Sequence, residues 1–220
     1  MRSDPGSQSR PGPEQVADAA VAEINDGDVL PEADPVALIH RLVRIGRTVA
    51  VAESLTGGLV LAALTSVPGA SAVVRGGVVA YAEELKTSLL GVEPEQLRRE
   101  SAVSPGVALQ MARGCRTLMG ADYGVSTTGE AGPDSASGQP VGTFYVAVSG
   151  PQGDGLCRGR GAGGRAQVRE SAVEAALALL DGTVADDAAG IGTVLDGSAP
   201  DVSPPARSRS TGHGNTHAAS

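Results

Sequence analysis

The sequence has few of the residue types on which several kinds of binding site depend. Only four aromatic side chains occur in 220 residues, three Tyr and one Phe, which excludes a base-stacking platform for nucleic acids and an aromatic core. The three His and two Cys residues show no zinc-like spacing, and two Cys cannot form a disulfide framework. The core must therefore consist of Val, Leu, Ala and Ile.

The charge balance and the hydropathy pattern exclude further classes of protein. With 17 basic and 25 acidic residues the net charge is −8, whereas nucleic-acid-binding proteins usually carry a basic surplus. No apolar run reaches the roughly 18 residues that a membrane span requires. The first ten residues lack the apolar segment of a secretory signal. We therefore expect a cytoplasmic protein with neither a membrane nor a nucleic acid as direct partner.

Composition divides the chain into three parts. Residues 1–34 are rich in Pro and small residues and are expected to form a flexible arm, although residues 14–24 have the pattern of a short helix. Residues 35–181 contain most of the large aliphatic side chains and are expected to form the folded domain. Residues 182–220 consist mostly of Gly, Ala, Ser, Thr, Asp and Pro, which predicts a disordered tail. Two His residues in that tail would make only a weak metal site, so we expect no metal.

The folded part alternates between helical and extended patterns. The strand segments at residues 123–128 and 143–149 show little alternation of polar and apolar residues, which indicates a sheet that is covered on both faces. The sequence thus predicts an α/β fold: a single three-layer domain whose mostly parallel or mixed sheet has helices on both faces. Helices are expected at residues 35–45, 58–64, 83–90, 105–119 and 165–180, and strands at residues 48–52, 76–81, 123–128 and 143–149.

One strand-to-helix turn, at residues 53–58, combines hydroxyl groups with glycines. Ser54 and Thr56 follow an apolar strand, at the end of the strand where open α/β sheets usually bind ligands. Gly57 and Gly58 then allow backbone N–H groups to approach an anion or a developing oxyanion closely. The alternative is that these residues only cap the following helix.

If Ser54 is a nucleophile, it needs a base. His40 is expected on the solvent side of a helix, and Arg stays protonated, so the base is expected to be a Lys or a carboxylate. Lys86 is the single Lys in the chain. Tyr81 ends a predicted strand five residues earlier, so Ser54, Tyr81 and Lys86 could form a proton relay. The alternative is a packed Tyr and a solvated Lys.

These residues lie within four blocks that resemble one known family. Residues 52–150 are similar to the C-terminal domain of the CinA (competence/damage-inducible protein) family, the PncC-like nicotinamide mononucleotide amidohydrolases. The matching blocks, in chain order, are residues 52–58, residues 76–81 followed by Lys86, residues 102–104, and residues 128–134 followed by residues 140–143.

The resemblance implies a fold, an activity and a set of site residues. Ser54 would be the nucleophile, Lys86 its base and Tyr81 a proton shuttle or positioning group. It implies hydrolysis of the carboxamide of nicotinamide mononucleotide to nicotinate mononucleotide and ammonia, by a homodimer and without a cofactor. The residues expected to bind the oxyanion or the substrate are Glu53, Thr56, Gly57, Gly58, Thr128, Gly129, Gly132 and Arg165.

Three features depart from the family pattern. Leu55 replaces the usual Cys after the Ser, and Glu130 replaces an apolar residue. The turn before the last helix keeps Arg165 but lacks an aromatic residue and an Asp. Glu130 would either repel a substrate phosphate or hold Arg165 by an ion pair. A catalytically altered domain that binds a nucleotide or a protein therefore stays open as the alternative to the deamidase.

Overall fold

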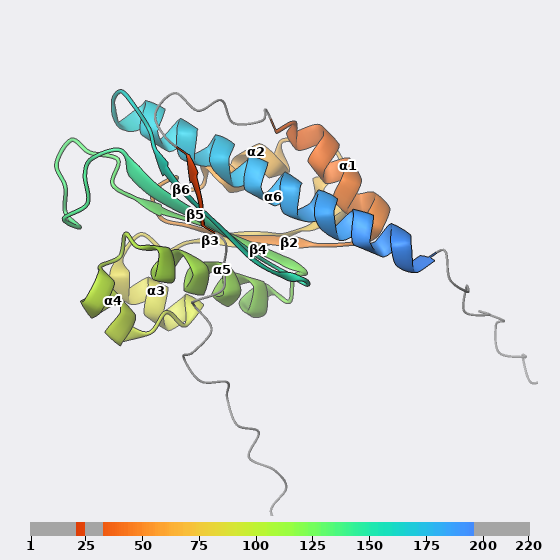
Figure 1. Cartoon of the computed structure of the whole chain (residues 1–220), viewed down its shortest axis with the longest axis horizontal. Helices are drawn as coiled ribbons and strands as arrows, with labels where there is room; N and C mark the ends of the chain where they lie inside the picture. The colour runs from red at the N-terminus through yellow and green to blue at the C-terminus, as the bar shows by residue number, and fades with distance from the viewer. Residues whose placement is uncertain (1–20, 25–32, 196–220) are drawn as a thin grey trace, which may run out of the picture.

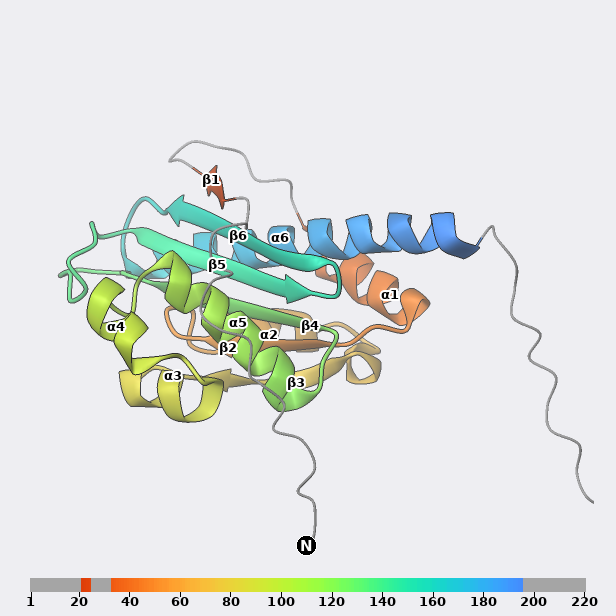
Figure 2. The same ribbon diagram turned by 60° about the horizontal axis from the view of Figure 1, so that its bottom comes forward.

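The protein is built around one mixed six-stranded sheet, seen between its helices in Figures 1 and 2. The computed structural model describes residues 21–24 and 33–195. The strand order is β1-β6-β5-β4-β2-β3, in which β2 runs parallel to β3 and β4, β1 runs parallel to β6, and β5 is antiparallel to both of its neighbours. The strands are β1 (Val21–Ile24), β2 (Val49–Glu53), β3 (Val74–Val79), β4 (Tyr123–Gly129), β5 (Thr143–Gly150) and β6 (Gly153–Arg160).

Helices cover both faces of this sheet, which confirms the predicted three-layer α/β class. Helices α1, α2 and α6 pack on one face and α3, α4 and α5 on the other (Figure 1). The helices are α1 (Pro35–Ile45), α2 (Leu59–Thr65), α3 (Glu83–Leu90), α4 (Pro94–Glu100), α5 (Pro105–Met119) and α6 (Arg165–Leu195), with a short 3₁₀ turn at Ala70–Ala72.

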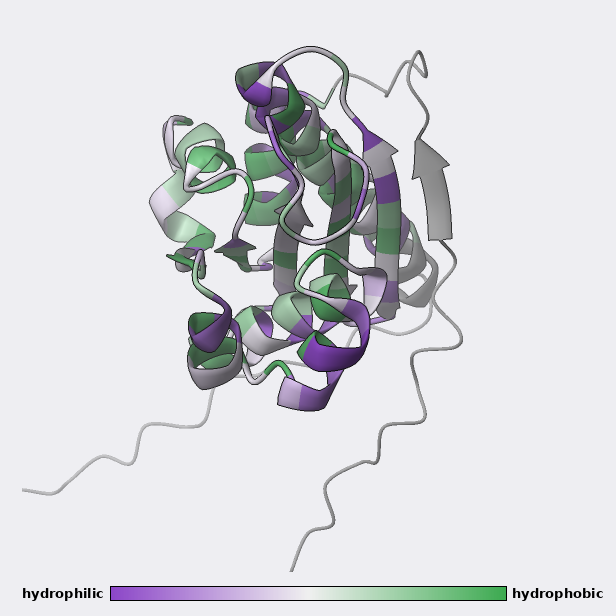
Figure 3. Cartoon of the chain, turned by 90° about the vertical axis from the view of Figure 1, so that its left-hand side faces the viewer, coloured by the Kyte–Doolittle hydropathy of each residue, from purple (hydrophilic) through white to green (hydrophobic). Residues whose placement is uncertain are grey.

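Strand β2 shows how the sequence supplies both layers of the core. Its side chains alternate between the two faces, as in any strand. Val49 and Val51 pack with α1, α2 and α6, whereas the smaller Ala50 and Ala52 pack with α3 and α5. Apolar residues also line the central strands in the hydropathy view of Figure 3. Because β4 and β5 are buried along almost their whole length, the expectation that both faces are covered is confirmed.

Helix ends follow the expected capping rules. The Asp34 carboxylate accepts a hydrogen bond from the N–H of Val36, and the Ser104 hydroxyl accepts one from the N–H of Val107. Gly46 and Gly120 adopt the left-handed conformation at the ends of α1 and α5. These local signals are why most helix boundaries were predictable within one or two residues.

Several expected elements need correction at the sheet edges. Residues 21–24 form β1 alongside β6, so the helical pattern over residues 14–24 is wrong at least there; the remainder of that expectation lies outside the described residues. Strand β3 ends at Val79 rather than Tyr81, and as an outer strand of the sheet it is only partly buried. The sequence predicted neither strand β6 nor helix α4. Their secondary-structure signals are weak, because β6 contains three glycines and α4 is short and mostly polar.

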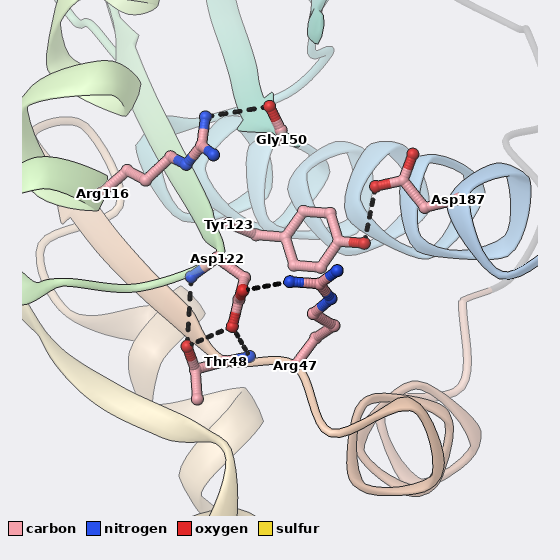
Figure 4. A network of polar contacts seen from close by, with 7 residues as sticks. All are labelled: Arg47, Thr48, Arg116, Asp122, Tyr123, Gly150 and Asp187. Atoms are coloured by element: carbon pink, nitrogen blue, oxygen red, sulfur yellow. Dashed lines mark hydrogen bonds and ion pairs between the residues drawn. The ribbon is translucent and has the colours of Figure 1, made fainter. Parts of the chain in front are cut away.

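The last helix is longer than predicted. It continues past Leu180 to Leu195, so the expectation of a disordered tail from residue 182 is wrong as far as Leu195; residues 196–220 lie outside the described residues. The Tyr123 hydroxyl donates a 2.7 Å hydrogen bond to the Asp187 carboxylate, next to an ion pair between Arg47 and Asp122 (Figure 4). Buried Val184 adds apolar contact. These tertiary contacts stabilise the helix beyond Leu180, as far as Asp187.

Candidate active site

The candidate site lies at the edge of the sheet where the parallel strands end. Strands β2, β3, β4 and β6 all point their carboxyl ends toward this edge, because β5 is antiparallel to both β4 and β6. Ser54 directly follows β2, Glu130 directly follows β4, and Arg165 opens α6 a few residues beyond β6. The topology therefore brings together residues that are more than a hundred positions apart in sequence.

Ser54 and Lys86 are hydrogen-bonded to each other. The Lys86 Nζ lies 3.1 Å from the Ser54 Oγ, so the two groups that the sequence singled out do meet. The N–H of Ser54 donates to the carbonyl of Thr127 at 3.0 Å, which fixes the start of the turn against β4. A charged amine donates in this contact, whereas a neutral amine can accept the hydroxyl proton and so generate the alkoxide nucleophile.

The amine of Lys86 is withdrawn from solvent. The residue is only 1% exposed, and its Nζ also donates to the carbonyl of Ala80 at 2.7 Å. Burial lowers the pKa of Lys86, and the charges of Glu83 and Glu84 oppose that shift only in part. The alternative of a solvated Lys is therefore wrong. A lysine with a depressed pKa beside a hydroxyl group has the properties of a general base.

Glu53 lies under helix α2 rather than in the cavity. It is 1% exposed, and its carboxylate accepts hydrogen bonds from the N–H groups of Gly58, Val60 and Leu61, at 2.8, 3.2 and 2.9 Å. Neither residue lines the cavity, and they are bonded to each other, so nothing here supports the predicted contact of Glu53 and Gly58 with the oxyanion or substrate, which stays a prediction. A buried carboxylate at a helix N-terminus instead satisfies donors that the helix leaves free.

The turn nevertheless keeps donors for an oxyanion. The Thr56 hydroxyl donates to Glu53 at 2.6 Å and contacts the Thr127 hydroxyl at 2.7 Å, so its side chain points into the interior. Among the described residues, the N–H groups of Leu55, Thr56 and Gly57 have no hydrogen-bond partner. Gly57 has φ +62°, a backbone conformation that favours glycine. The candidate oxyanion donors are therefore these three N–H groups, placed before Gly58.

Tyr81 and Arg165 form a pair of their own at the mouth of the cavity. Tyr81 is 63% exposed, and its hydroxyl oxygen accepts a 3.0 Å hydrogen bond from Arg165, whose guanidinium also donates to the carbonyl of Gly132 at 2.9 Å. Among the described residues the phenol is hydrogen-bonded to neither Ser54 nor Lys86, so the predicted proton relay through it is not formed in this structure. Only the carbonyl of Tyr81 lies near the Lys86 Nζ, at 3.5 Å.

Glu130 ties down the loop between β4 and β5. Its carboxylate accepts hydrogen bonds from the N–H groups of Ala136 and Ser137 at 2.9 and 3.0 Å, and from the Ser137 hydroxyl at 2.9 Å. No ion pair with Arg165 is present among the described residues. The expected ion pair between Glu130 and Arg165 is therefore not formed. Glu130 lines the cavity, and repulsion of a substrate phosphate by its carboxylate stays a prediction.

Strand β4 supplies the floor of the site. The Thr128 hydroxyl donates to the carbonyl of Ala102 at 2.7 Å, which joins β4 to the segment before α5. Gly129 has no room for a side chain, since a Cβ there would lie 2.8 Å from the Phe144 Cβ and 2.9 Å from a Leu55 methyl group. Both residues line the cavity, although the Thr128 hydroxyl already has a partner, and their contact with a substrate stays a prediction.

Ser54, Lys86, Tyr81 and Arg165 line one cavity of about 200 Å³. Glu83 lines it as well; the sequence did not predict this residue, although it stands in the first turn of α3 near Lys86. The lining residues are Ser54, Leu55, Tyr81, Glu83, Lys86, Ala102, Val103, Thr128, Gly129, Glu130, Ala131, Ala136, Ser137 and Arg165.

Other nucleophiles and metals find less support in the structure. Burial raises the pKa of the Cys115 thiol to about 12 and that of the Cys157 thiol to about 11, which makes both poor nucleophiles. His40 is exposed, as expected. Within the described ranges no group of three or more His, Cys, Asp or Glu side chains could hold a metal ion, and no helix there is long and apolar enough to cross a membrane.

The fold and the site define a class of protein: an α/β domain with a lysine-paired serine at the carboxyl edge of a mixed sheet. Residues 34–184 match the model of the CinA C-terminal domain, so the chain belongs to the CinA family.

Individual relatives agree with this assignment. The chain is 49% identical over 139 residues to a CinA-like protein of Frankia casuarinae and 50% identical over 138 residues to one of Thermosynechococcus vestitus. These alignments cover 63% and 61% of this chain but 32% and 33% of the relatives, so the chain spans about a third of their length.

Two solved structures have the same fold. A CinA superfamily protein of Klebsiella pneumoniae is 33% identical with a TM-score of 0.67, over 69% of this chain and 96% of that chain. The competence/damage-inducible protein CihA of Agrobacterium tumefaciens is 37% identical with a TM-score of 0.61, over 70% of this chain and 96% of that chain.

Proposed function

We propose that this CinA-family domain is an amidohydrolase that converts nicotinamide mononucleotide to nicotinate mononucleotide and ammonia. The observation that carries the proposal is the 3.1 Å contact between the buried amine of Lys86 and the hydroxyl of Ser54. A serine paired with a lysine of lowered pKa is an arrangement suited to acyl transfer.

The chemistry follows from the groups in place. Neutral Lys86 takes the Ser54 hydroxyl proton as the oxygen attacks the carboxamide carbon. N–H groups of the turn at residues 55–57 stabilise the oxyanion that forms. The carbon–nitrogen bond then breaks, and the Lys86 ammonium returns its proton to the departing nitrogen, which leaves as ammonia. Lys86 then deprotonates a water molecule, whose oxygen attacks the ester carbon. The ester bond breaks, the Lys86 ammonium returns the proton to the Ser54 oxygen, and the product leaves as the carboxylate.

The charges around the cavity suit a substrate that carries both signs. The nicotinamide ring of the mononucleotide is a pyridinium cation, and the carboxylates of Glu83 and Glu130 line the same cavity. Arg165 stands exposed at the rim, where its guanidinium can pair with the phosphate. In this arrangement Tyr81 and the Gly132 carbonyl hold Arg165 in place.

Ammonia release from nicotinamide mononucleotide tests the proposal. We expect the wild-type protein to release one ammonia per nicotinate mononucleotide formed, and Ser54→Ala to release none above background. Free nicotinamide, which lacks the phosphate that Arg165 would bind, should be a much poorer substrate. Equal rates for wild type and Ser54→Ala would remove Ser54 from the mechanism.

Calorimetry separates the deamidase from the catalytically altered binding module. If the wild-type protein binds the mononucleotide with a measurable heat but releases no ammonia, the binding module is favoured. The departure from the family pattern at Glu130, which holds the loop between β4 and β5, is the feature that would set such a module apart. The homodimer implied by the family would be measured in the same preparation by sedimentation.

The pH dependence of kcat/KM should report Lys86. Because the neutral amine is the base, activity rises as the pH increases through the pKa of Lys86, and burial places that midpoint below the ordinary value of 10.5. Glu84→Gln removes a charge that raises this pKa, so it should move the rising limb to lower pH. Rate profiles of the two proteins measure the shift; a midpoint at or above 10.5, or a shift in the opposite direction, would contradict the assignment.

A further inference from the structure

Arg169, which none of the sequence motifs singled out, binds the back of the turn that follows Ser54. It lies one helical turn after Arg165 on α6 and is half-buried. Its Nε donates to the carbonyl of Leu55 at 3.2 Å, and its Nη2 donates to the carbonyl of Thr56 at 2.7 Å. A Cβ added at Gly57 would lie 3.4 Å from the same Nη2, so the guanidinium and the turn are closely packed.

The two carbonyls belong to consecutive peptide groups. The peptide group of the Leu55 carbonyl contains the N–H of Thr56, and that of the Thr56 carbonyl contains the N–H of Gly57. In a trans peptide the N–H points opposite to the C=O, and both of these peptides are trans. The N–H groups of Thr56 and Gly57 therefore point away from Arg169. They have no partner among the described residues, whereas the N–H groups of Gly58, Val60 and Leu61 are held by Glu53.

The direction of these N–H groups follows from the layers of the fold. Arg169 reaches the turn from α6, on one face of the sheet, while Lys86 reaches Ser54 from α3, on the other face (Figure 1). Groups that point away from Arg169 consequently point toward the side from which Lys86 approaches. An oxyanion formed by attack of Ser54 would lie on that side.

We propose that Arg169 is the positioning residue of the oxyanion hole: by binding the carbonyls of Leu55 and Thr56, it turns and polarises the N–H groups of Thr56 and Gly57 toward the oxygen on which the negative charge develops. This inference rests on the proposed amidohydrolase function. A hydrogen bond to a carbonyl makes the N–H of the same peptide a stronger donor, and a guanidinium adds its full charge. Donors that are oriented in advance need no rearrangement when the charge develops.

Kinetics of Arg169→Gln and Arg169→Lys test this role. We expect kcat for Arg169→Gln to fall about tenfold to a hundredfold, since the donors remain but lose their orientation, while KM changes little. Arg169→Lys, which keeps the charge but binds one carbonyl at a time, should fall between Arg169→Gln and wild type. The midpoint of the kcat/KM profile should stay where it is in wild type, because Lys86 is untouched.

Arg41→Gln is the matched control. Arg41 also binds a backbone carbonyl, that of Asp181 at 3.1 Å, together with the Asp181 carboxylate, and it braces the same helix away from the site. We expect Arg41→Gln to lower stability without changing kcat. If Arg169→Gln behaves in the same way, with lower stability and an unchanged kcat, Arg169 is only a brace and the proposal is wrong.

Amide resonances provide a readout that does not depend on turnover. In ¹⁵N-labelled protein the amide signals of Thr56 and Gly57 should shift in both Arg169 variants, while the amide of Leu55, whose peptide carbonyl belongs to Ser54, should move less. None should move in Arg41→Gln. If the Thr56 and Gly57 amides shift in the Arg169 variants while the wild-type protein releases no ammonia, the positioning contact is supported and the deamidase is rejected. Unshifted amides would overturn the positioning role at any level of activity.

Discussion

Replacement of Lys86 by methionine is expected to lower kcat/KM for nicotinamide mononucleotide by about 10²- to 10⁴-fold, the usual contribution of a positioned general base. Methionine fills most of the volume of the buried lysine stem but offers no group to accept the Ser54 proton. In the wild-type protein the carbonyl of Ala80 accepts a 2.7 Å hydrogen bond from the Lys86 amine. The variant leaves this carbonyl without its partner, which should lower the free energy of unfolding by about 1 to 3 kcal/mol. Ammonia release measures the first effect and urea unfolding the second.

The double variant makes this prediction sharper. If Ser54 and Lys86 act as one unit, Ser54→Ala with Lys86→Met should lose no more activity than Ser54→Ala alone. Lys86→Arg tests the base separately from the charge, because a guanidinium stays protonated and should be nearly as inactive as methionine. Losses that add up in the double variant would show that the two side chains act independently, contrary to the 3.1 Å contact between them.

Replacement of Glu53 by alanine should destabilise the domain by about 3 to 5 kcal/mol, because several buried donors lose their acceptor together. These donors are the N–H groups of Gly58, Val60 and Leu61 and the hydroxyl of Thr56. Glu53→Gln should lose less, since one side-chain oxygen remains, but its amide group would face N–H groups that need an acceptor. Chemical unfolding followed by circular dichroism measures the differences.

Glu95 is a suitable control for Glu53. It pairs with Arg98 on the exposed surface of α4, where an ion pair contributes little because both groups are well solvated. Glu95→Ala should therefore show no measurable loss of stability. A Glu53→Ala variant as stable as Glu95→Ala would mean that water replaces the carboxylate at no cost, and that Glu53 does not hold the N-terminus of α2.

Local signals in the chain were sufficient for most of the fold. Asp34 and Ser104 mark helix starts, and left-handed glycines mark helix ends. The lack of polar–apolar alternation in β4 and β5 indicates strands covered on both faces, so these elements could be predicted from neighbouring residues alone. Strand β6 and the end of α6 could not. Their stability comes from pairing with β5 and from the contact between Tyr123 and Asp187, which join distant parts of the chain.

The candidate site divides in the same way. The residue types alone pointed to Ser54 and Lys86 as candidate nucleophile and base. Ser54 lies in a turn that combines hydroxyl groups with two glycines, and Lys86 is the single lysine in the chain. Only the packing of α3 against the end of β2 determines that they touch and that the amine is dry. The roles of Glu53 as a helix anchor, of Tyr81 as a partner of Arg165, and of Arg169 behind the turn depend on which side chain reaches which peptide group across the sheet. Hydrogen bonds between elements far apart in sequence decide that, and no local pattern of residues encodes them.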